Sequence, residues 1–228
     1  MADYVVKICG VCRPQDARLA SEAGADYVGV LVDVPGTPRS RAMGEAMEIA
    51  AATTVPLVVL LWMPSVEEAR EAASALRPRA IQLLADEPPE LLSAIRVGCR
   101  VEVWKAVHLP ARGTGTVDVD AMVCGLESYA AAGAERVVLD AKAVVDGRER
   151  RGGTGQASDW TVAAELVRRS PCPVLLAGGI TPENAAEAIR VTQPAGVDVS
   201  SGVESHIGEK DPEKVRAIIE RVHSLGRA

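Results

Sequence analysis

The stretch VLLAGGITPENAAEAIRVTQPAGVDVSSG, residues 174–202, contains two short apolar runs separated by a helix-like segment. The runs Val174–Ala177 and Gly196–Val199 are mostly apolar, which is typical of parallel strands that are buried on both faces. The segment 182–190 follows a threonine and begins with a proline, a residue favoured at the first position of a helix. The stretch therefore predicts a strand, a helix and a second strand parallel to the first.

The same alternation extends along the whole chain and predicts eight strand-then-helix units. Strands are expected at Tyr4–Cys9, Tyr27–Val32, Leu57–Trp62, Ala80–Leu84, Val101–Val107, Arg136–Asp140, Val174–Ala177 and Gly196–Val199. Helices are expected near residues 14–24, 42–52, 65–76, 88–97, 120–133, 159–170, 182–190 and 211–225. Strict alternation predicts an α/β fold of the (β/α)8 TIM barrel type, with residues 1–228 as a single domain; a doubly wound open sheet is the main alternative. Residues 110–119 and 144–151 are expected to be long loops after the fifth and sixth strands.

Composition and charge restrict the partners and the compartment. Of the 228 residues, 48% are hydrophobic, which suffices for a large core, and the net charge of −6 argues against a nucleic-acid partner. No apolar run is long enough to span a membrane and the first residues are not those of a signal peptide, so we expect a cytoplasmic protein with no membrane partner. The five cysteines are scattered, which indicates free thiols. Cys9 and Cys12 have no second ligand pair at matching spacing, so no metal site is predicted.

Three glycine-containing strings follow apolar runs or begin loops in the last part of the chain. Glycine allows backbone N–H groups to approach an anion closely, and a helix N-terminus adds a partial positive charge. One such string is a weak signal, but three in successive units predict one phosphate group held from several sides. The residues assigned to this phosphate site are Gly153, Thr154, Gly155, Gly178, Gly179, Ser200, Ser201 and Gly202.

Reactive side chains are expected where the strands end, because the catalytic residues of a (β/α)8 barrel lie at that face. Cys9 ends the first strand, where helix N-termini favour a thiolate, although most free cysteines are buried core residues. Asp140 ends the sixth strand and is either a reactive acid or a capping residue or ion-pair partner of Lys142 or Arg150. Lys7 lies within the first strand and is expected to pair with an acid inside the barrel.

Three further polar residues keep two interpretations each. Arg39 lies in the loop after the second strand, where a guanidinium suits a carboxylate or a phosphate, but solvated surface arginines are more common. His108 follows the fifth strand and is either an acid–base group or a bystander in a loop. Glu204 is placed either to touch a substrate or to cap a helix.

These motifs together resemble those of phosphoribosylanthranilate isomerase. The resemblance rests on strings that occur in the right order over nearly the whole chain: VKICG at 6–10, Leu139-Asp140, GGTG at 152–155, LAGGI at 176–180, PEN at 182–184, VDVSSGVE at 197–204 and GEKD at 208–211. It implies a (β/α)8 barrel that performs an Amadori rearrangement in tryptophan biosynthesis, without a cofactor and with a small phosphosugar as its partner.

The resemblance also implies roles for individual residues. Asp140 is the general acid that protonates the ring oxygen of the ribose, and Cys9 is the general base that removes the proton from C2. The second role requires a thiol pKa below its ordinary value. Arg39 matches the arginine that recognises the anthranilate carboxylate, and Lys7 and Gln82 complete the expected substrate-binding residues.

Two positions depart from the family pattern on the side of the aglycone, the group attached to the phosphosugar. The usual Gln-Leu-His-Gly after the fourth strand is here Gln-Leu-Leu-Ala, with Leu84 in place of the histidine, and Met63 stands where an asparagine is frequent. These departures leave open a related enzyme acting on another phosphorylated amino sugar, and a barrel that binds phosphosugars without turnover. The chain is expected to be a monomer or a homodimer.

Overall fold

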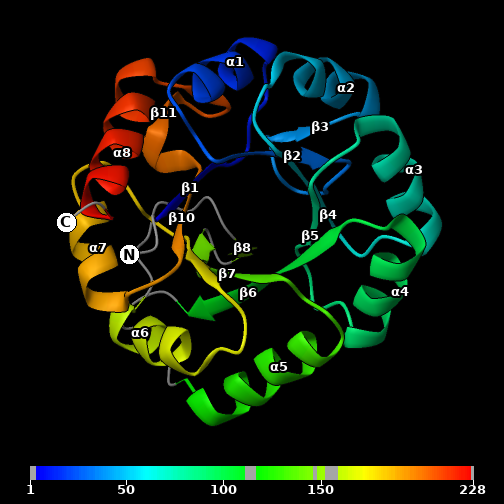
Figure 1. Ribbon diagram of the computed structural model, residues 1–228, viewed down its shortest axis with the longest axis vertical. Helices are drawn as coiled ribbons and strands as arrows, with labels where there is room; N and C mark the ends of the chain where they lie inside the picture. Colours follow the sequence, from blue (N-terminus) through cyan, green and yellow to red (C-terminus); the bar gives the residue numbers. More distant parts are fainter. Residues whose placement is uncertain (1–3, 111–116, 146–147, 152–158, 227–228) are drawn as a thin grey trace.

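Eight parallel strands form a closed barrel, and eight helices surround it (Figure 1). The computed structural model describes residues 4–110, 117–145, 148–151 and 159–226, and all counts refer to these residues. The barrel strands are β1 (Val5–Ile8), β2 (Tyr27–Val32), β4 (Leu57–Leu61), β5 (Ala80–Leu83), β6 (Glu102–Pro110), β7 (Arg136–Val145), β9 (Val174–Leu176) and β10 (Gly196–Val199). The helices are α1 (Pro14–Glu22), α2 (Met43–Ala52), α3 (Val66–Leu76), α4 (Pro89–Cys99), α5 (Val119–Ala131), α6 (Trp160–Arg169), α7 (Ala185–Thr192) and α8 (Pro212–Leu225).

The barrel closes because the first strand pairs with both the second and the last. Lys7 of β1 is in register with Asp198 of β10 on one side and with Tyr27 of β2 on the other. The remaining neighbours around the ring are parallel as well. This order confirms the predicted (β/α)8 barrel as a single domain and excludes the doubly wound open sheet, which has two free edges.

Alternate residues of the strands build two separate apolar layers. Side chains such as Val58, Leu60 and Trp104 fill the inside of the barrel, while their neighbours along each strand pack against the helices. Trp104 is fully buried, and its ring meets that of Tyr27 edge to face with 5.0 Å between the centroids. Burial on both faces explains why the strand sequences are continuous apolar runs.

Local sequence decides where several helices begin. The Ser65 hydroxyl accepts a hydrogen bond from the Glu68 N–H, and the Glu68 carboxylate accepts one from the Ser65 N–H, which forms a capping box at the start of α3. The carboxylates of Asp159 and Asp211 accept the first N–H groups of α6 and α8. Side-chain caps therefore fix the first residues of these three helices.

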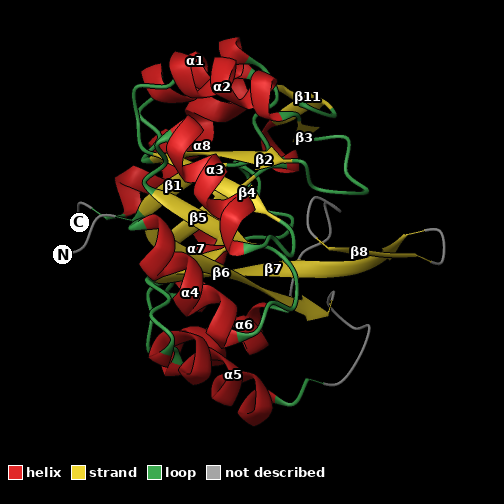
Figure 2. Ribbon diagram, turned by 90° about the vertical axis from the view of Figure 1, so that its right-hand side faces the viewer, coloured by secondary structure: helices red, strands yellow, loops and turns green. Residues whose placement is uncertain are grey.

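Two predicted loops contain strand residues instead. β7 continues beyond Asp140 to Val145 and pairs antiparallel with β8 (Arg148–Arg151), so that a hairpin projects from the barrel (Figure 2). The prediction of a loop at 144–151 was therefore wrong in this part, because backbone pairing extends the strand past the barrel rim. β6 likewise includes Pro110, the first residue of the other predicted loop, and 111–116 lie outside the described residues. Short strands complete the structure: β3 (Ser40–Arg41), β11 (Glu204–His206) and β12 (Glu209–Lys210).

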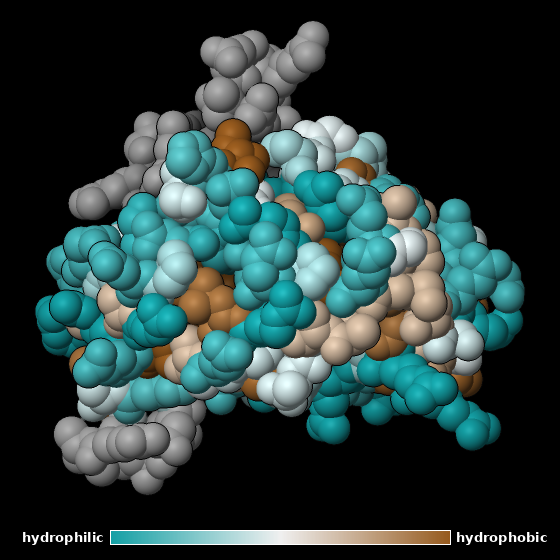
Figure 3. Space-filling view, turned by 90° about the horizontal axis from the view of Figure 1, so that it is seen from above, coloured by the Kyte–Doolittle hydropathy of each residue, from teal (hydrophilic) through white to brown (hydrophobic). Residues whose placement is uncertain are grey.

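The outer surface seen over α1 and α2 is mainly hydrophilic, with hydrophobic side chains in small separate groups (Figure 3). Met47 of α2 contributes an exposed apolar side chain, with 49% of its surface accessible. Within the described ranges, each helix is too short or too polar to cross a lipid bilayer.

Candidate active site

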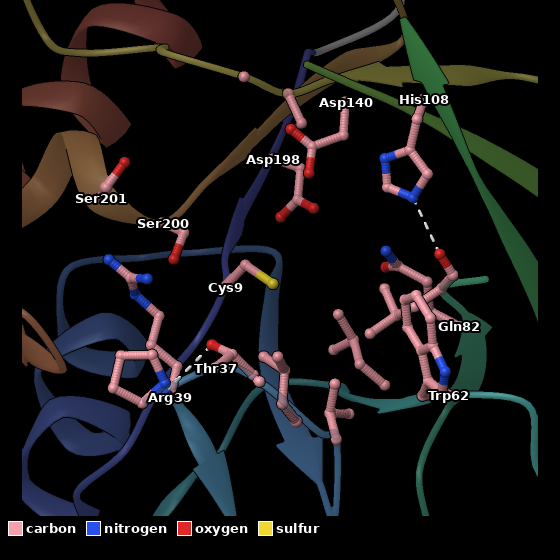
Figure 4. Close-up of a pocket in the computed structure, with 18 of the residues that line it drawn as sticks. Cys9, Thr37, Arg39, Trp62, Gln82, His108, Asp140, Asp198, Ser200 and Ser201 are labelled. Atoms are coloured by element: carbon pink, nitrogen blue, oxygen red, sulfur yellow. Dashed lines mark hydrogen bonds between the residues drawn. The ribbon is translucent and has the colours of Figure 1, made fainter. Parts of the chain in front are cut away.

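A pocket of about 370 Å³ opens at the carboxyl ends of the barrel strands. All eight barrel strands, or the residues directly after them, contribute to its lining: Cys9, Leu31, Leu60, Gln82, His108, Asp140, Ala177 and Asp198. In Figure 4 Cys9 lies near the centre, Asp140 and Asp198 lie together on one side, and Gln82 and Trp62 lie on another. The structure therefore brings the two predicted catalytic residues into one cavity.

Cys9 lies beside a buried ion pair that joins the first and last strands. Lys7 Nζ is 2.9 Å from both carboxylate oxygens of Asp198 and 3.1 Å from Cys9 Sγ. The side chain of Lys7 is completely buried, and Cys9 follows two residues later on the same face of the chain. The prediction that Lys7 pairs with an acid inside the barrel is thereby confirmed, and the acid is Asp198.

The side chain of Cys9 is a thiol at neutral pH. Burial and the nearby Asp198 carboxylate raise the pKa of Cys9 to about 11, although the Lys7 ammonium acts in the opposite direction. The expectation of a pKa below the ordinary value was therefore wrong for this state. A carboxylate and a dry environment outweigh one ammonium group, and this balance depends on distances that no sequence motif encodes.

Asp140 faces the same cavity and is held by its own backbone neighbour. Its Oδ1 accepts a hydrogen bond of 2.8 Å from the Ala141 N–H. Burial, together with the charge of Asp198, raises the pKa of Asp140 to about 7. A carboxyl group with this pKa is half protonated near neutral pH, which suits a general acid.

Arg39 belongs to a second buried charge cluster at the rim of the pocket. Its Nε and Nη2 donate to the two oxygens of Glu204 at 2.8 and 2.6 Å, and Lys210 Nζ lies 3.1 Å from Glu204 Oε1. Despite burial, these partners hold the pKa of Glu204 below its ordinary value. Glu204 thus orients Arg39, a role that neither sequence interpretation of Glu204 included. Recognition of a substrate carboxylate by Arg39 stays a prediction.

Two of the three glycine-containing strings that were predicted to bind phosphate lie side by side at the pocket. The Gly202 Cα lies so close to the next loop that an added Cβ would be 1.9 Å from the Ile180 carbonyl oxygen. Gly178 has a φ of +81°, and a Cβ there would collide with Ala141. Asn184 holds the loop between them, because its amide donates to the Gly179 carbonyl and accepts from the Thr181 N–H, each at 2.8 Å. Gly178, Gly179, Ser200, Ser201 and Gly202 all line the pocket. The third string, with Gly153, Thr154 and Gly155, lies outside the described residues.

The wall opposite these loops is formed by β4, β5 and β6. Trp62 and Leu84 line the pocket there, whereas Met63 does not and is 53% exposed. His108 contacts this wall through a 2.9 Å hydrogen bond between its Nε2 and the Leu84 carbonyl. Gln82 Oε1 is buried, and among the described residues it has no hydrogen-bond partner. Gln82 therefore lies where it was predicted to act, and Trp62 takes the place that the sequence analysis gave to Met63.

Several residues of the site were not assigned from the sequence. Asp198 stands alone in an apolar strand, as Lys7 does, and two opposite charges of this kind were a signal that they pair across a sheet. Lys210 is also buried, and it donates to the Ser200 carbonyl at 3.1 Å. Trp62 carried a weaker signal, since it ends an apolar strand two residues after the inward-facing Leu60.

Known proteins match this chain over nearly its whole length. The family model described as N-(5'phosphoribosyl)anthranilate (PRA) isomerase matches residues 6–221. The chain belongs to this family. A relative from Natronomonas pharaonis named N-(5'-phosphoribosyl)anthranilate isomerase is 37% identical over 220 residues, which cover 94% of this chain and 96% of the relative. One of the same name from Rhodopseudomonas palustris (strain HaA2) is 40% identical over 221 residues, 94% of either chain.

Solved structures agree with this membership. Phosphoribosyl anthranilate isomerase from Thermotoga maritima superposes with a TM-score of 0.80 at 30% identity, covering 97% of this chain and all of the other. A structure of the isomerase in complex with reduced 1-(o-carboxyphenylamino)-1-deoxyribulose 5-phosphate gives 0.78 at 29% identity, again covering 97% of this chain and 100% of the other. The chain is thus an isomerase of the aldose–ketose type that belongs to tryptophan biosynthesis.

Proposed function

We propose that this isomerase converts N-(5'-phosphoribosyl)anthranilate into 1-(2-carboxyphenylamino)-1-deoxyribulose 5-phosphate by an Amadori rearrangement. The observation that carries the proposal is the meeting of Cys9 and Asp140 in one cavity beside the glycine loops. An Amadori step needs an acid at the ring oxygen and a base at C2, and both must reach one bound sugar.

The two groups act in sequence. Asp140 gives its proton to the ring oxygen, the C1–O bond breaks, and the nitrogen lone pair forms an iminium with C1. Cys9 as thiolate then removes the proton from C2, and the C–H electrons neutralise the iminium to an enolamine. In the last step the Cys9 thiol gives its proton to C1 and the Asp140 carboxylate takes the proton of the enol hydroxyl, which restores both groups.

The charges around the pair support this order of steps. The Lys7 ammonium lies 3.1 Å from Cys9 Sγ and stabilises negative charge on sulfur, and Asp198 in turn holds Lys7. Asp198 also favours the protonated form of Asp140, which is the form that an acid needs. The developing iminium adds a positive charge beside Cys9 at the moment when the thiolate is required.

The phosphate is proposed to lie on the loops after β9 and β10. Gly178, Gly179 and Gly202 leave backbone close to the cavity, and Ser200 and Ser201 add hydroxyl groups. Gly153, Thr154 and Gly155 complete this site on the strength of the family resemblance. Glycine-rich loops of this kind bind phosphate through backbone N–H groups.

The test is the turnover of phosphoribosylanthranilate, measured by loss of its fluorescence. Cys9→Ala and Asp140→Asn are each expected to lower kcat by about 10²–10⁴-fold, the usual contribution of a positioned acid or base. Cys124→Ala, at an exposed cysteine of α5, serves as the matched control and retains full activity. Full activity in both active-site variants would overturn the assigned roles.

The two alternatives left open by Leu84 and Met63, another substrate or binding without turnover, predict other outcomes. An enzyme for another phosphorylated amino sugar would turn over that compound and would not rescue a tryptophan auxotroph. A barrel that only binds phosphosugars would show a ligand-induced rise in Tm without conversion. A cytoplasmic location, the single-domain boundaries 1–228 and a monomeric or homodimeric state belong to the same proposal. Sedimentation velocity distinguishes the two states, and one solved relative consists of generated monomers of an isomerase from Thermotoga maritima that is described as dimeric.

A further inference from the structure

We propose that Trp62 is a specificity-determining residue, and that its indole ring stacks on the aromatic ring of the substrate's aglycone. The inference deepens the proposed function and rests on it for the position of the sugar. Trp62 lines the pocket and is 36% exposed, so part of its side chain is accessible from the cavity. Figure 4 shows it across the cavity from Ser200 and Ser201.

The position of the aglycone follows from the two ends of the substrate. The phosphate is assigned to the loops after β9 and β10, and the reacting carbons C1 and C2 must lie between Cys9 and Asp140. The amine substituent on C1 then points away from the phosphate, toward the wall formed by β4, β5 and β6. Trp62, Leu84 and His108 form the upper layer of this wall.

Strand geometry explains why these side chains face the cavity. Val58 and Leu60 of β4 point into the barrel, and Trp62 continues the same alternation. On β5, Gln82 is in register with Leu60, and Leu84 follows two residues later. Trp62 and Leu84 directly follow the ends of β4 and β5, two residues beyond Leu60 and Gln82.

The backbone of this wall is held by a buried anchor, which we define as Glu87 with Lys105. Glu87 Oε1 accepts hydrogen bonds from the N–H groups of Met63 and Ala85, both at 3.0 Å. Glu87 is fully buried and its Oε2 lies 3.1 Å from Lys105 Nζ. The residues next to Trp62 and Leu84 are thus bound to one carboxylate, so the wall is preorganised.

Gln82 supplies a second observation that points to an aryl amine. Gln82 is 2% exposed, and its Oε1 is buried without a hydrogen-bond partner among the described residues. A buried acceptor of this kind is costly unless a ligand supplies a donor. The N–H that links an aromatic aglycone to C1 is such a donor, next to a ring that lies on Trp62. Aromatic pairs prefer offset-stacked or edge-to-face arrangements with centroids 4.5–7 Å apart.

The experiment compares two ligands in variants of Trp62. The probes are reduced 1-(o-carboxyphenylamino)-1-deoxyribulose 5-phosphate and ribulose 5-phosphate, which lacks the aryl amine, and binding is followed by calorimetry. Trp62→Ala is expected to weaken the first probe about tenfold and the second less than twofold. Trp62→Phe keeps most of the affinity, and Met47→Ala on α2 is the matched surface control.

Equal affinity of Trp62→Ala and the wild type for the aryl probe would overturn the inference, and so would an equal loss for both probes. Gln82→Met tests the polar part: the wild type prefers the N–H probe over its ether analogue about tenfold, and the variant loses this preference. The proposed function is scored separately by turnover in the wild type. Binding that depends on Trp62 without turnover would support the inference and refute the proposed reaction.

Discussion

At the scale of single residues, burial and the nearby Asp198 charge set the protonation states of Cys9 and Asp140. The pKa of Cys9 is raised to about 11 and that of Asp140 to about 7, so near pH 8 the resting pair is a thiol and a carboxylate. The productive pair is the reverse: a thiolate and a carboxylic acid. Between the two pKa values the productive pair is a small, constant fraction of the enzyme.

This order of pKa values predicts the pH profile of the reaction. kcat/KM is expected to rise up to about pH 7, because the thiolate fraction of Cys9 grows while Asp140 is still protonated. It stays level between the two pKa values and falls above about pH 11, where Cys9 is fully ionised and the acid form of Asp140 continues to decline. The break near pH 7 is set by the pKa of the acid and the break near pH 11 by the pKa of the base, because between them the gain in thiolate offsets the loss of carboxylic acid. Initial rates from pH 5 to 11 measure the profile.

The Asp140→Asn variant serves as the control, since its residual activity must keep rising above pH 7 instead of levelling off. A profile that falls between pH 7 and 9 would contradict the two pKa values.

Asp140 also costs the folded protein stability at neutral pH. Its pKa is raised from 3.8 to about 7, so the folded state binds the proton more tightly and stability decreases as pH rises through this window. Asp140→Asn is therefore expected to raise Tm at pH 8 by at least ~2 °C, given about 2–4 °C per kcal/mol for a domain of this size. Thermal melts at pH 8 and pH 4 test the prediction, and the gain must shrink at the lower pH. An Asn variant that melts below the wild type at pH 8 would refute it.

At the scale of elements, the loops after β9 and β10 work as one unit because they touch. A Cβ on Gly202 would lie 1.9 Å from the Ile180 carbonyl oxygen. Gly202→Ala is therefore expected to separate the loops and to weaken phosphate binding at least tenfold, with an overpacking cost of about 1–3 kcal/mol. Calorimetry with inorganic phosphate and urea unfolding measure the two effects. Gly44→Ala in α2 has open space around it and is expected to stabilise the protein by up to about 1 kcal/mol. Unchanged phosphate affinity in Gly202→Ala would count against the phosphate site.

The anchor formed by Glu87 and Lys105 also acts at the scale of elements, because it joins the loops after β4 and β5. Glu87→Gln leaves Lys105 buried beside a neutral group, which is expected to cost about 3–5 kcal/mol. The loops after β4 and β5 lose their shared carboxylate, so KM should rise together with the loss of stability. Urea unfolding and substrate kinetics test this. Glu67→Gln is the matched control, because its pair with Arg70 is exposed and contributes little. Normal KM in Glu87→Gln would show that the anchor does not position the wall.

At the scale of the whole molecule, the barrel depends on the seam between the first and last strands. Gly196 of β10 is in register with Val5 of β1, and a Cβ there would lie 2.1 Å from the Val5 carbonyl oxygen. Gly196→Ala is expected to push the strands apart and to cost about 3 kcal/mol or more, at the upper end of overpacking. The urea midpoint measures the loss, with Gly125→Ala in α5, where there is open space, as the control. A wild-type midpoint would show that the seam tolerates a side chain.

Some parts of the site were predictable from the sequence, and others depend on closure of the barrel. Cys9 and Asp140 end or lie on apolar strands, so their place at the mouth followed from the pattern of eight strands. The pairing of Lys7 with Asp198 joins residues 191 positions apart, and only barrel closure brings them to 2.9 Å. The β7–β8 hairpin was missed because its sequence is charged and resembles a loop.

The amino-acid sequence by itself determined the barrel, since eight apolar runs and eight helical segments leave few ways to bury both faces of a sheet. It also placed Cys9, Asp140, Gln82 and two glycine strings at one end of that barrel. Only the tertiary structure decided that Cys9 rests as a thiol, that Arg39 is held by Glu204, and that Trp62 rather than Met63 faces the cavity. These outcomes depend on distances between charges and on the direction of single side chains. Such quantities exist only once distant strands are packed together.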